Sequence, residues 1–355
     1  MTTLRPGPQK VLFGKLLRWA TPALLSAVGW MIASSQSSSA GDIAVSVDGN
    51  DLYVTEAPDD VNADNSVQIY MLDGQIRVEC RDGMINDGEN FDGDDFLDVG
   101  RPDSLYLDLA GGNDLLVMQG VTPAGDFTSE FVDVVLLLGD ETAAPGTDAD
   151  QLVIWGIDAY GSMTVRTGAD RDELFINEAK VGERTGLDSL DVNTGSGSDS
   201  VILEDSLQLP EYVFIRTYTS GSENDADGVI LENLTSLGSL YTYTGAGPDD
   251  LIVTNAIINK DLYFLTGSGD DVLQIGGSFA LNRFYLSCSS GNDRVSMNDN
   301  GLVNARVYGG SGTDRLTHRE SLDSQDVKSG WEFINGRPMY TAPFPTTTWS
   351  MTTIR

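Results

Sequence analysis

Two residue types that often carry chemistry are scarce in this chain. Its 355 residues include two cysteines, Cys80 and Cys288, and one histidine, His318. Small secreted scaffolds that depend on disulfides use many more cysteines. We therefore expect Cys80 and Cys288 to be separate thiols and Cys288 to act as a small buried residue.

Positive charge is also scarce. The chain has 21 basic against 54 acidic residues and a formal net charge of −33. Such a surface repels nucleic acid and anionic lipid and attracts cations. The hydrophobic content of 40%, with 12 Tyr and 12 Phe, is too high for a disordered acidic tail. The negative charge therefore belongs to a folded protein.

Long apolar runs are rare, and the clearest one lies near the N-terminus. Residues 20–33 are mostly apolar, follow a stretch with four basic residues, and precede small residues ending at Ala40. A spanning helix needs about 20 apolar residues. The pattern predicts a signal peptide over residues 1–40, with an uncleaved anchor as the alternative. We expect a bacterial protein that is secreted or held at the cell surface, with no transmembrane span after signal removal.

The sequence has no apolar runs with helical periodicity, but it contains a repeated glycine–aspartate motif. Nine times a glycine-bearing turn is followed by an aspartate and by apolar residues two and, with one exception, four positions later. The nine aspartates are Asp114, Asp150, Asp172, Asp199, Asp227, Asp249, Asp271, Asp293 and Asp314, at spacings of 36, 22, 27, 28, 22, 22, 22 and 21 residues. A period of this length indicates one supersecondary unit per repeat, stacked on its neighbours.

Period-two apolar residues on both sides of the turn predict short strands. A propeller blade would need about 40 residues and four strands. The sequence therefore predicts an all-β, single-stranded parallel β-helix of about nine coils of about 22 residues. Five positions before the aspartate, seven coils carry Leu109, Thr167, Thr194, Thr244, Thr266, Cys288 and Gly309. We expect the threonines to form an inward hydrogen-bonded ladder.

The flanks of the repeat have a different pattern. Residues 43–55 and 67–79 each alternate around a turn signal, Gly49-Asn50 and Asp73-Gly74, and predict two β-hairpins. We assign residues 41–104 to an N-terminal β cap with an acidic loop, 105–318 to the β-helix repeats, and 319–355 to a C-terminal cap and tail. The bulky Trp331 is expected to close the last coil.

Stacked aspartates would repel one another unless they are solvated, protonated or bridged by cations. Calcium prefers hard oxygen ligands, which carboxylates and turn carbonyls supply. GGSGTDRLT (residues 309–317) resembles the nonapeptide of the RTX, or haemolysin-type, calcium-binding repeats, and GSGSDSV (195–201), GAGPDDL (245–251) and GSGDDVL (267–273) match all but its first glycine.

The RTX resemblance implies that the nine aspartates hold calcium. It covers short turns only, and each coil here has one such turn, whereas RTX coils have two. The alternative is that glycine and aspartate serve only as turn residues. Residues 82–98 are also dense in acidic residues, but Asp95 stands where an EF-hand requires glycine, so a solvated loop is equally consistent.

Tyrosines recur on the expected outer face of the upstream strands. Tyr106, Tyr241, Tyr263 and Tyr285 lie eight positions before an aspartate, and Tyr243 and Tyr308 share that face. Such a stripe could bind sugar rings or a partner protein. Alternatively, the rings only stack on one another and cover the sheet.

Evidence for catalysis is weak. Carboxylate pairs occur at Asp94-Asp95, Asp249-Asp250 and Asp270-Asp271, but the last two are part of the regular turns. We expect a calcium-associated surface or extracellular structural or adhesion protein, whose partners are calcium ions and extracellular polysaccharide or a surface protein. The alternative is a polysaccharide lyase or hydrolase, which a groove built by the insertions at 121–130, 141–146 and 218–224 would favour.

Overall fold

The computed structural model describes most of the chain after residue 40. The described residues are 41–57, 63–72, 75–81, 83, 85–86, 96–120, 130–139, 149–182, 188–205, 208–218, 224–319, 322, 327–335 and 337–338. Contacts divide the chain into Met1–Ser39 and Ala40–Arg355, and every described residue belongs to the second unit. The predicted signal peptide, most of the acidic segment 82–98, nearly all of the three insertions and the tail from Thr341 lie outside the described residues.

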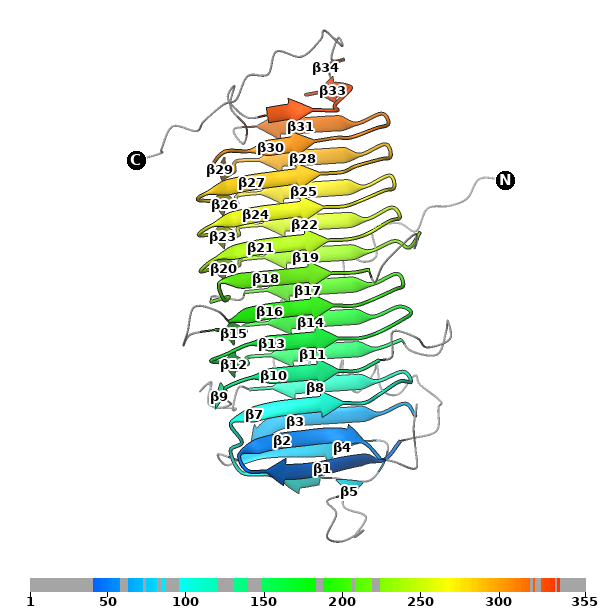
Figure 1. The fold of residues 1–355 in the computed structure, drawn as a ribbon, viewed down its shortest axis with the longest axis vertical. Coiled ribbons are helices and arrows are strands. Elements are labelled where there is room, and N and C mark those ends of the chain that lie inside the picture. The colour runs from blue at the N-terminus through cyan, green and yellow to red at the C-terminus, as the bar shows by residue number, and fades with distance from the viewer. Residues whose placement is uncertain are drawn as a thin grey trace, which may run out of the picture. The chain divides into compact units, whose positions relative to one another are not determined.

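The described residues form strands and no helix, as the sequence predicted (Figure 1). One large sheet, here the front sheet, contains the strands that precede the aspartate turns. In spatial order it comprises β32 (Val327–Ser329), β30 (Arg306–Tyr308), β27 (Arg283–Ser287), β24 (Asp261–Leu265), β21 (Ser239–Tyr243), β18 (Tyr212–Arg216), β16 (Ser189–Asn193), β13 (Met163–Arg166), β10 (Val134–Leu137), β7 (Ser104–Asp108), β2 (Asp51–Glu56), β1 (Ile43–Asp48) and β5 (Ile85–Asn86).

A second large sheet, here the back sheet, contains the strands that follow the aspartates. It comprises β34 (Arg337–Pro338), β33 (Phe333–Ile334), β31 (Arg315–Arg319), β28 (Arg294–Asn298), β25 (Val272–Gly276), β22 (Asp250–Thr254), β19 (Gly228–Glu232), β17 (Ser200–Glu204), β14 (Glu173–Asn177), β11 (Gln151–Trp155), β8 (Leu115–Gln119), β3 (Ser66–Leu72), β4 (Gln75–Cys80) and β6 (Phe96–Asp98).

Short strands between the front and back strands form a third side of the repeats. They are β9 (Glu130–Phe131), β12 (Asp158–Ala159) and β15 (Lys180–Val181) in one sheet, and β20 (Thr235–Ser236), β23 (Ile257–Ile258), β26 (Phe279–Ala280) and β29 (Gly301–Leu302) in another. Bridges from Lys180 to Gln208 and from Leu209 to Ser236 connect the two. Each regular repeat therefore contributes three strands.

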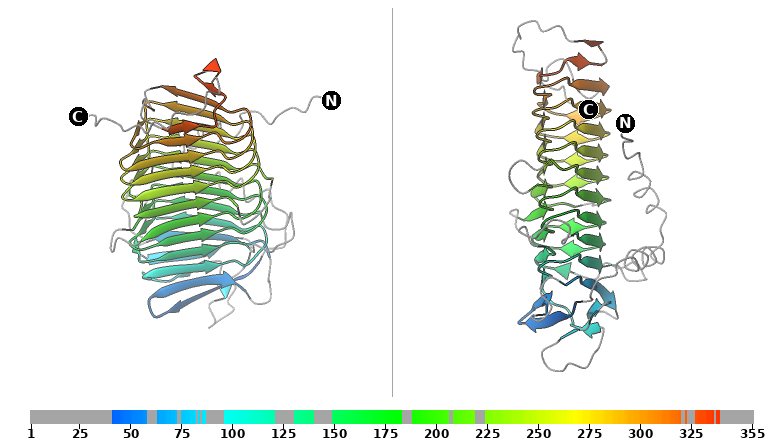
Figure 2. Two further views of the ribbon diagram at one scale, coloured as in Figure 1. Left: turned by 45° about the horizontal axis from the view of Figure 1, so that its top comes forward. Right: turned by 90° about the vertical axis from the view of Figure 1, so that its right-hand side faces the viewer.

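Equivalent residues of successive repeats are register partners in parallel strands. Leu240 pairs with Leu262, which pairs with Phe284, at spacings equal to those of the aspartates. Figure 2 shows the front and back strands stacked in the same order along the solenoid. The described part of the chain is thus an all-β structure with long parallel sheets, as expected of a β-helix or solenoid.

The core lies between the front and back sheets. Alternate residues of each strand face inward, because successive side chains of a strand point to opposite faces. The residues two positions after the nine aspartates are all buried, at 0 to 2% exposure. At the C-terminal end Trp331 is buried and donates its indole N–H to the carbonyl oxygen of Val307 at 3.1 Å.

Two repeats place their front strand farther from the aspartate than the others do. β10 and β18 stand in the front sheet in register with their neighbours, and Val134 and Val213 occupy the inward column. The front sheet therefore keeps its register in these two repeats, although more residues separate the strand from Asp150 or Asp227.

Both predicted hairpins are present. β1 pairs antiparallel with β2, and β3 pairs antiparallel with β4. β2 and β3 also pair in parallel with β7 and β8, so the two hairpins continue the front and back sheets. Within the described ranges, we find no helix with the length and apolar character needed to cross a bilayer.

Candidate functional site

The aspartate turns owe their glycines to close packing between coils. Gly267 and Gly269 have φ values of 77° and 144°, a region that side chains with a Cβ rarely adopt. A Cβ on Gly269 would lie 1.9 Å from the carbonyl oxygen of Gly247 in the preceding coil. Glycine two positions before the aspartate therefore lets one turn lie directly on the next.

The nine aspartates form a continuous ladder inside the solenoid, here the aspartate ladder. Their exposure is between 0 and 4%. From Asp114 onward, the backbone N–H of each aspartate donates to Oδ1 of the next one at 2.8 to 3.0 Å. Asn65 donates in the same way to Asp114, and Asp314 donates to Glu332. The carboxyl groups thus satisfy backbone amides that would otherwise be buried without an acceptor.

The second carboxyl oxygen faces the inward threonine column. Thr167, Thr194 and Thr217 lie with their hydroxyl oxygens 2.5 to 2.7 Å from Oδ2 of the aspartate in the same coil. Thr244 instead donates to the carbonyl oxygen of Thr266 at 3.3 Å. The predicted inward column of threonines is therefore present, but its hydroxyls contact carboxyl groups and carbonyls rather than one another, and the hydroxyl of Thr266 has no hydrogen-bond partner among the described residues.

Burial shifts these carboxyl groups toward the neutral form. It raises the pKa of Asp199 and Asp249 to about 8, although the hydroxyl of Thr194, which donates to Asp199, and the backbone amides that donate to both carboxyl groups act in the opposite direction. Burial also raises the pKa of Asp293 to about 7 and that of Asp271 to about 6, and like charges on neighbouring coils add to the shift. Near neutral pH, several members of the aspartate ladder therefore hold a proton.

The structure places all nine predicted ligands in one row, and this row has a structural explanation. Among the described residues, no three or more His, Cys, Asp or Glu side chains converge in a way that could hold a metal ion. Calcium binding by Asp114, Asp150, Asp172, Asp199, Asp227, Asp249, Asp271, Asp293 and Asp314 therefore stays a prediction.

Comparison with known proteins adds no assignment. No family model, no curated protein and no solved structure matches this chain.

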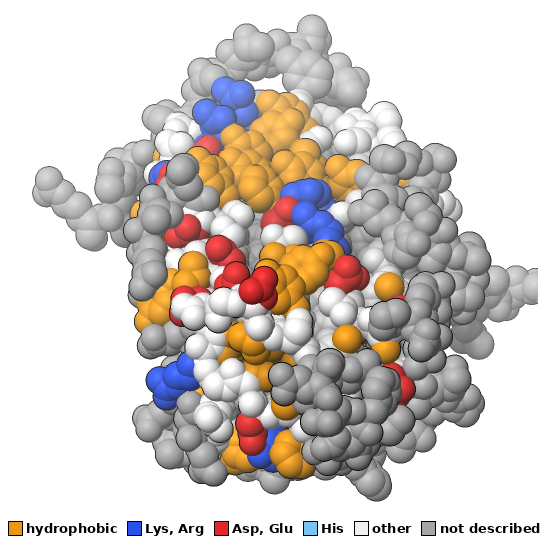
Figure 3. Space-filling view, turned by 60° about the horizontal axis from the view of Figure 1, so that its bottom comes forward, with side chains coloured by type: hydrophobic (Ala, Val, Ile, Leu, Met, Phe, Trp, Pro, Cys, Tyr) orange, Lys and Arg blue, Asp and Glu red, His pale blue; other side chains and the backbone are white. Residues whose placement is uncertain are grey.

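A second arrangement lies on the outer face of the front sheet. Its members are aromatic side chains of β18, β21, β24, β27 and β30, here the aromatic ladder: Phe214, Tyr241, Tyr263, Tyr285 and Tyr308. Successive ring centroids are 5.0, 5.0, 5.6 and 5.5 Å apart, and the first two pairs are stacked with interplanar angles of 14° and 13°. Figure 3 shows hydrophobic side chains gathered over the C-terminal half of this face.

Sequence reasoning found most of this ladder but missed its first ring. Tyr241, Tyr263, Tyr285 and Tyr308 belong to the expected outer stripe. Phe214 lies in a repeat whose turn is lengthened by an insertion, so counting back from Asp227 does not reach it. The alternation of Val213, Phe214 and Ile215 was the signal that could have placed it.

The expected carboxylate pairs do not face each other. Asp249 and Asp271 are buried, whereas their neighbours Asp250 and Asp270 are exposed. Adjacent residues that point to opposite sides of the chain cannot share one substrate. The pair Asp94-Asp95 lies outside the described residues.

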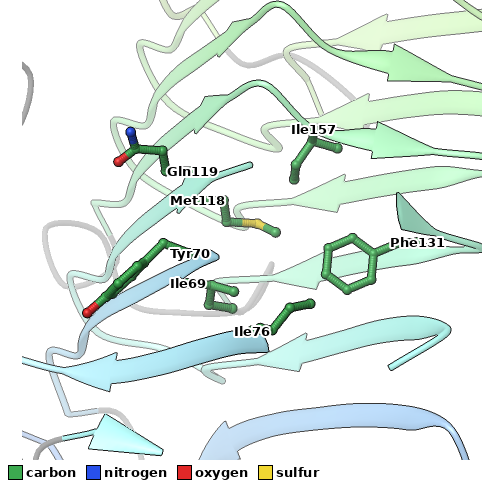
Figure 4. A pocket seen from close by; sticks show the side chains of 7 residues that line it. All are labelled: Ile69, Tyr70, Ile76, Met118, Gln119, Phe131 and Ile157. Carbon is green, nitrogen blue, oxygen red and sulfur yellow. The ribbon is translucent and has the colours of Figure 1, made fainter. Parts of the chain in front are cut away.

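A small pocket near the N-terminal end also offers little chemistry (Figure 4). It is lined by Ile69, Tyr70, Ile76, Met118, Gln119, Phe131 and Ile157. The polar groups of this lining are one phenol and one amide, and the Tyr70 hydroxyl donates to Glu79 at 3.1 Å. Apart from the Tyr70 hydroxyl, this lining contains no acid, base or nucleophile.

Both cysteines are buried free thiols, as expected. Burial raises the pKa of Cys288 well above its ordinary value. A thiol of this kind is a poor nucleophile because the reactive form is the thiolate.

Proposed function

We propose that this chain is an exported surface or extracellular adhesion protein that binds through the aromatic ladder of its front sheet. In this proposal the aspartate ladder builds the scaffold, and the outer face of the front sheet makes contact with a polysaccharide or surface protein. The repeats form about nine coils, and the hairpins β1–β2 and β3–β4 cap their N-terminal end. Removal of residues 1–40 accompanies export.

The observation that carries this proposal is the uninterrupted row of aromatic rings on five neighbouring strands. Tyrosine combines a large rigid apolar body with a polar hydroxyl, and it loses little conformational entropy when it binds. Each ring of the aromatic ladder is held by its neighbours at 5.0 to 5.6 Å, so the binding surface is formed before the ligand arrives. Preformed surfaces of this kind reduce the cost of association.

Cosedimentation with insoluble polysaccharides and with cell envelopes tests the proposal. The double variant Tyr241→Ser, Tyr263→Ser should bind at least about tenfold more weakly, because two adjacent rings are removed from the surface. The matched control is Tyr53→Ser, Tyr106→Ser, a tyrosine pair 5.9 Å apart on the same sheet but outside the aromatic ladder. Equal binding by the two double variants would show that the aromatic ladder only covers the sheet.

Calcium association is a separate part of the proposal. The buried Oδ2 atoms of Asp249, Asp271, Asp293 and Asp314 meet no hydrogen-bond donor among the described residues, and they are the oxygens that a cation would contact. A bound ion stabilises the folded state by RT ln(1 + [L]/Kd). Thermal melting in calcium and in chelator therefore tests this part independently of any ligand of the aromatic ladder.

A further inference from the structure

The face that carries the aromatic ladder has an excess of positive charge, although the chain as a whole is strongly acidic. The outward side chains of β18, β21, β24, β27 and β30 include Arg216, Arg283 and Arg306 and a single acid, Asp261. Over the full sequence, acidic residues outnumber basic ones by 54 to 21. On this face basic residues therefore outnumber acidic ones, whereas the opposite holds for the full chain.

Two arginines stand at the N-terminal end of the aromatic ladder. Arg166 and Arg216 each donate to a different oxygen of Asp191 at 2.6 Å, so two guanidinium groups share one carboxylate. The guanidinium carbon of Arg216 also lies 5.5 Å from the ring centroid of Phe214. One positive charge is left in excess beside the first ring.

The other two arginines lie farther along the ladder. Arg283 donates to the hydroxyl oxygen of Tyr263 at 2.7 Å. Arg306 is exposed and is the register partner of Tyr285. Positive groups thus accompany the rings over the length of the aromatic ladder, and the fork of N–H donors on a guanidinium matches the geometry of a carboxylate.

We infer that the ligand of the aromatic ladder is an anionic polysaccharide, a polymer with carboxylates on its sugar rings, lying along the stacking direction. This inference rests on the proposed function and names its ligand class. Phe214, Tyr241 and Tyr263 stack face to face, and the later rings are tilted by 34° and 46° against their neighbours. Ring edges and tyrosine hydroxyls therefore contribute much of the outer surface, with about one ring per 4.8 Å strand spacing. An extended chain of sugar rings presents C–H and O–H groups with a similar repeat, and its carboxylates meet the arginines.

A peptide strand fits this face less well. The backbone groups of the front strands are hydrogen-bonded to neighbouring strands within the sheet. Peptides that extend a sheet need free backbone groups at an edge. Only side chains are therefore available to contact a ligand on this face, through their hydroxyl, ring-edge and guanidinium groups.

The net charge of the chain gives this binding an unusual dependence on salt. The screening length is about 30 Å at 0.01 M, about 8 Å at 0.15 M and about 3 Å at 1 M salt. At low salt the polymer is repelled by the whole acidic chain, and near physiological salt it interacts mainly with the local arginines. At high salt that attraction is also screened. Binding of an anionic polymer should therefore be strongest at intermediate salt.

Polygalacturonate and its methyl ester provide the matched probes, because they share one backbone and differ in the charge of the carboxyl group. The full chain should bind polygalacturonate at least tenfold more tightly than the ester, with the strongest binding at intermediate salt. Arg283→Gln together with Arg306→Gln should remove most of this preference. The control pair, Arg294→Gln with Arg315→Gln, changes the net charge equally on the exposed face of the back sheet and should leave the preference unchanged.

Circular dichroism first checks that all variants are folded. Polygalacturonate that binds no more tightly than its ester overturns the inference, and so does an equal loss in both arginine pairs. Equal binding of polyglutamate would show that charge alone is recognised, which also overturns it. If both polysaccharide forms bind equally and the Tyr241→Ser, Tyr263→Ser variant loses both, the inference fails while the proposed function stands.

Discussion

The hydroxyl oxygen of Thr167 lies 2.5 Å from Oδ2 of Asp172 and 3.3 Å from the carbonyl oxygen of Thr194. A threonine hydroxyl has a single proton to donate, and both neighbours are acceptors when the carboxyl group is ionised. A hydrogen bond between a hydroxyl and a carboxyl oxygen is typically about 2.5 to 3.0 Å long, so the proton is donated to Asp172 and the 3.3 Å contact with the carbonyl is weak. Thr217 repeats this arrangement, at 2.7 Å from Asp227 and 3.4 Å from the carbonyl of Thr244. In both coils the threonine hydroxyl therefore donates to the buried carboxyl group, and the carbonyl oxygen is the more distant neighbour.

The first prediction concerns pH. The pKa of Asp199 and Asp249 is about 8 in the folded chain, against about 3.9 in an unfolded one. The folded state therefore holds protons that the unfolded state releases, and the free energy of unfolding falls as pH rises. The contribution of each group to the free energy of unfolding is fully present below about pH 4 and decreases as the pH rises to about 8. The decrease is at most about 1.4 kcal/mol per pH unit for each group.

Urea denaturation at about pH 5, 7 and 9 measures this dependence. Asp249→Asn is the matched control, because the amide retains an acceptor for the backbone N–H of Asp227 and has no proton to lose in this range. The variant should show a shallower decline than the parent chain. A stability that does not change between about pH 5 and 9 would indicate that these carboxyl groups are already ionised at about pH 5.

The second prediction separates the acceptor from the charge. Asp271→Ala removes the acceptor of the Asp249 backbone N–H, which is 3.0 Å from Oδ1 of Asp271. Leaving that amide buried without a partner should cost about 1 to 3 kcal/mol in the free energy of unfolding. Asp271→Asn keeps the acceptor and the shape and should cost less than about 1 kcal/mol. Equal losses in the two variants would show that the carboxyl group itself is required.

The third prediction concerns the turn glycines. Gly269→Ala introduces a Cβ 1.9 Å from the carbonyl oxygen of Gly247, at a φ of 144°. The clash and the backbone strain together should cost on the order of 3 kcal/mol. Gly276→Ala is the control, because the nearest atom to its Cβ is 3.9 Å away. That variant should be neutral or more stable by about 0.4 to 1 kcal/mol, and a similar loss in both would contradict the close approach seen at the turn.

The fourth prediction uses calcium. A protonated carboxyl group is a poor calcium ligand, so protons and calcium compete for the same oxygens. The calcium proposal therefore predicts a smaller increase in melting temperature with millimolar calcium at about pH 6 than at about pH 9, and no increase at either pH would contradict it. An increase of many degrees in calcium would support the metal sites implied by the RTX resemblance. Asp271→Asn should then abolish part of that increase.

The sequence predicts the interior better than it predicts the chemical state of the aspartates. Apolar residues such as Leu251 and Val253 recur at fixed offsets from each aspartate, so the inward columns follow directly from the spacing. Whether Asp249 is solvated, protonated or bridged by a cation depends on how deeply the turn is buried. That depth follows from the stacking of coils, which a local pattern does not specify.

One structural column has no common residue type and could not be predicted. The residue six positions after the aspartate is Glu178, Asp205, Asn233, Asn255 or Asp299 in five repeats, and all of them have φ between 51° and 55°. They share a left-handed turn rather than a side chain. Asn255 donates to Asn233 at 3.0 Å, and Asn233 donates to Asp205 at 2.6 Å, so polar side chains also connect the coils at this corner.

The end residues of the aspartate ladder give the solenoid a modular length. Asn65 provides the first donor and Glu332 the last acceptor, and every link between them joins one aspartate to the next. A copy of one 22-residue period, such as residues 250–271, would bring its own donor and acceptor to both new junctions. A whole period can therefore be duplicated or deleted while Asn65 and Glu332 still complete the hydrogen bonds at the two ends. The length of the binding face would then change by one coil at a time.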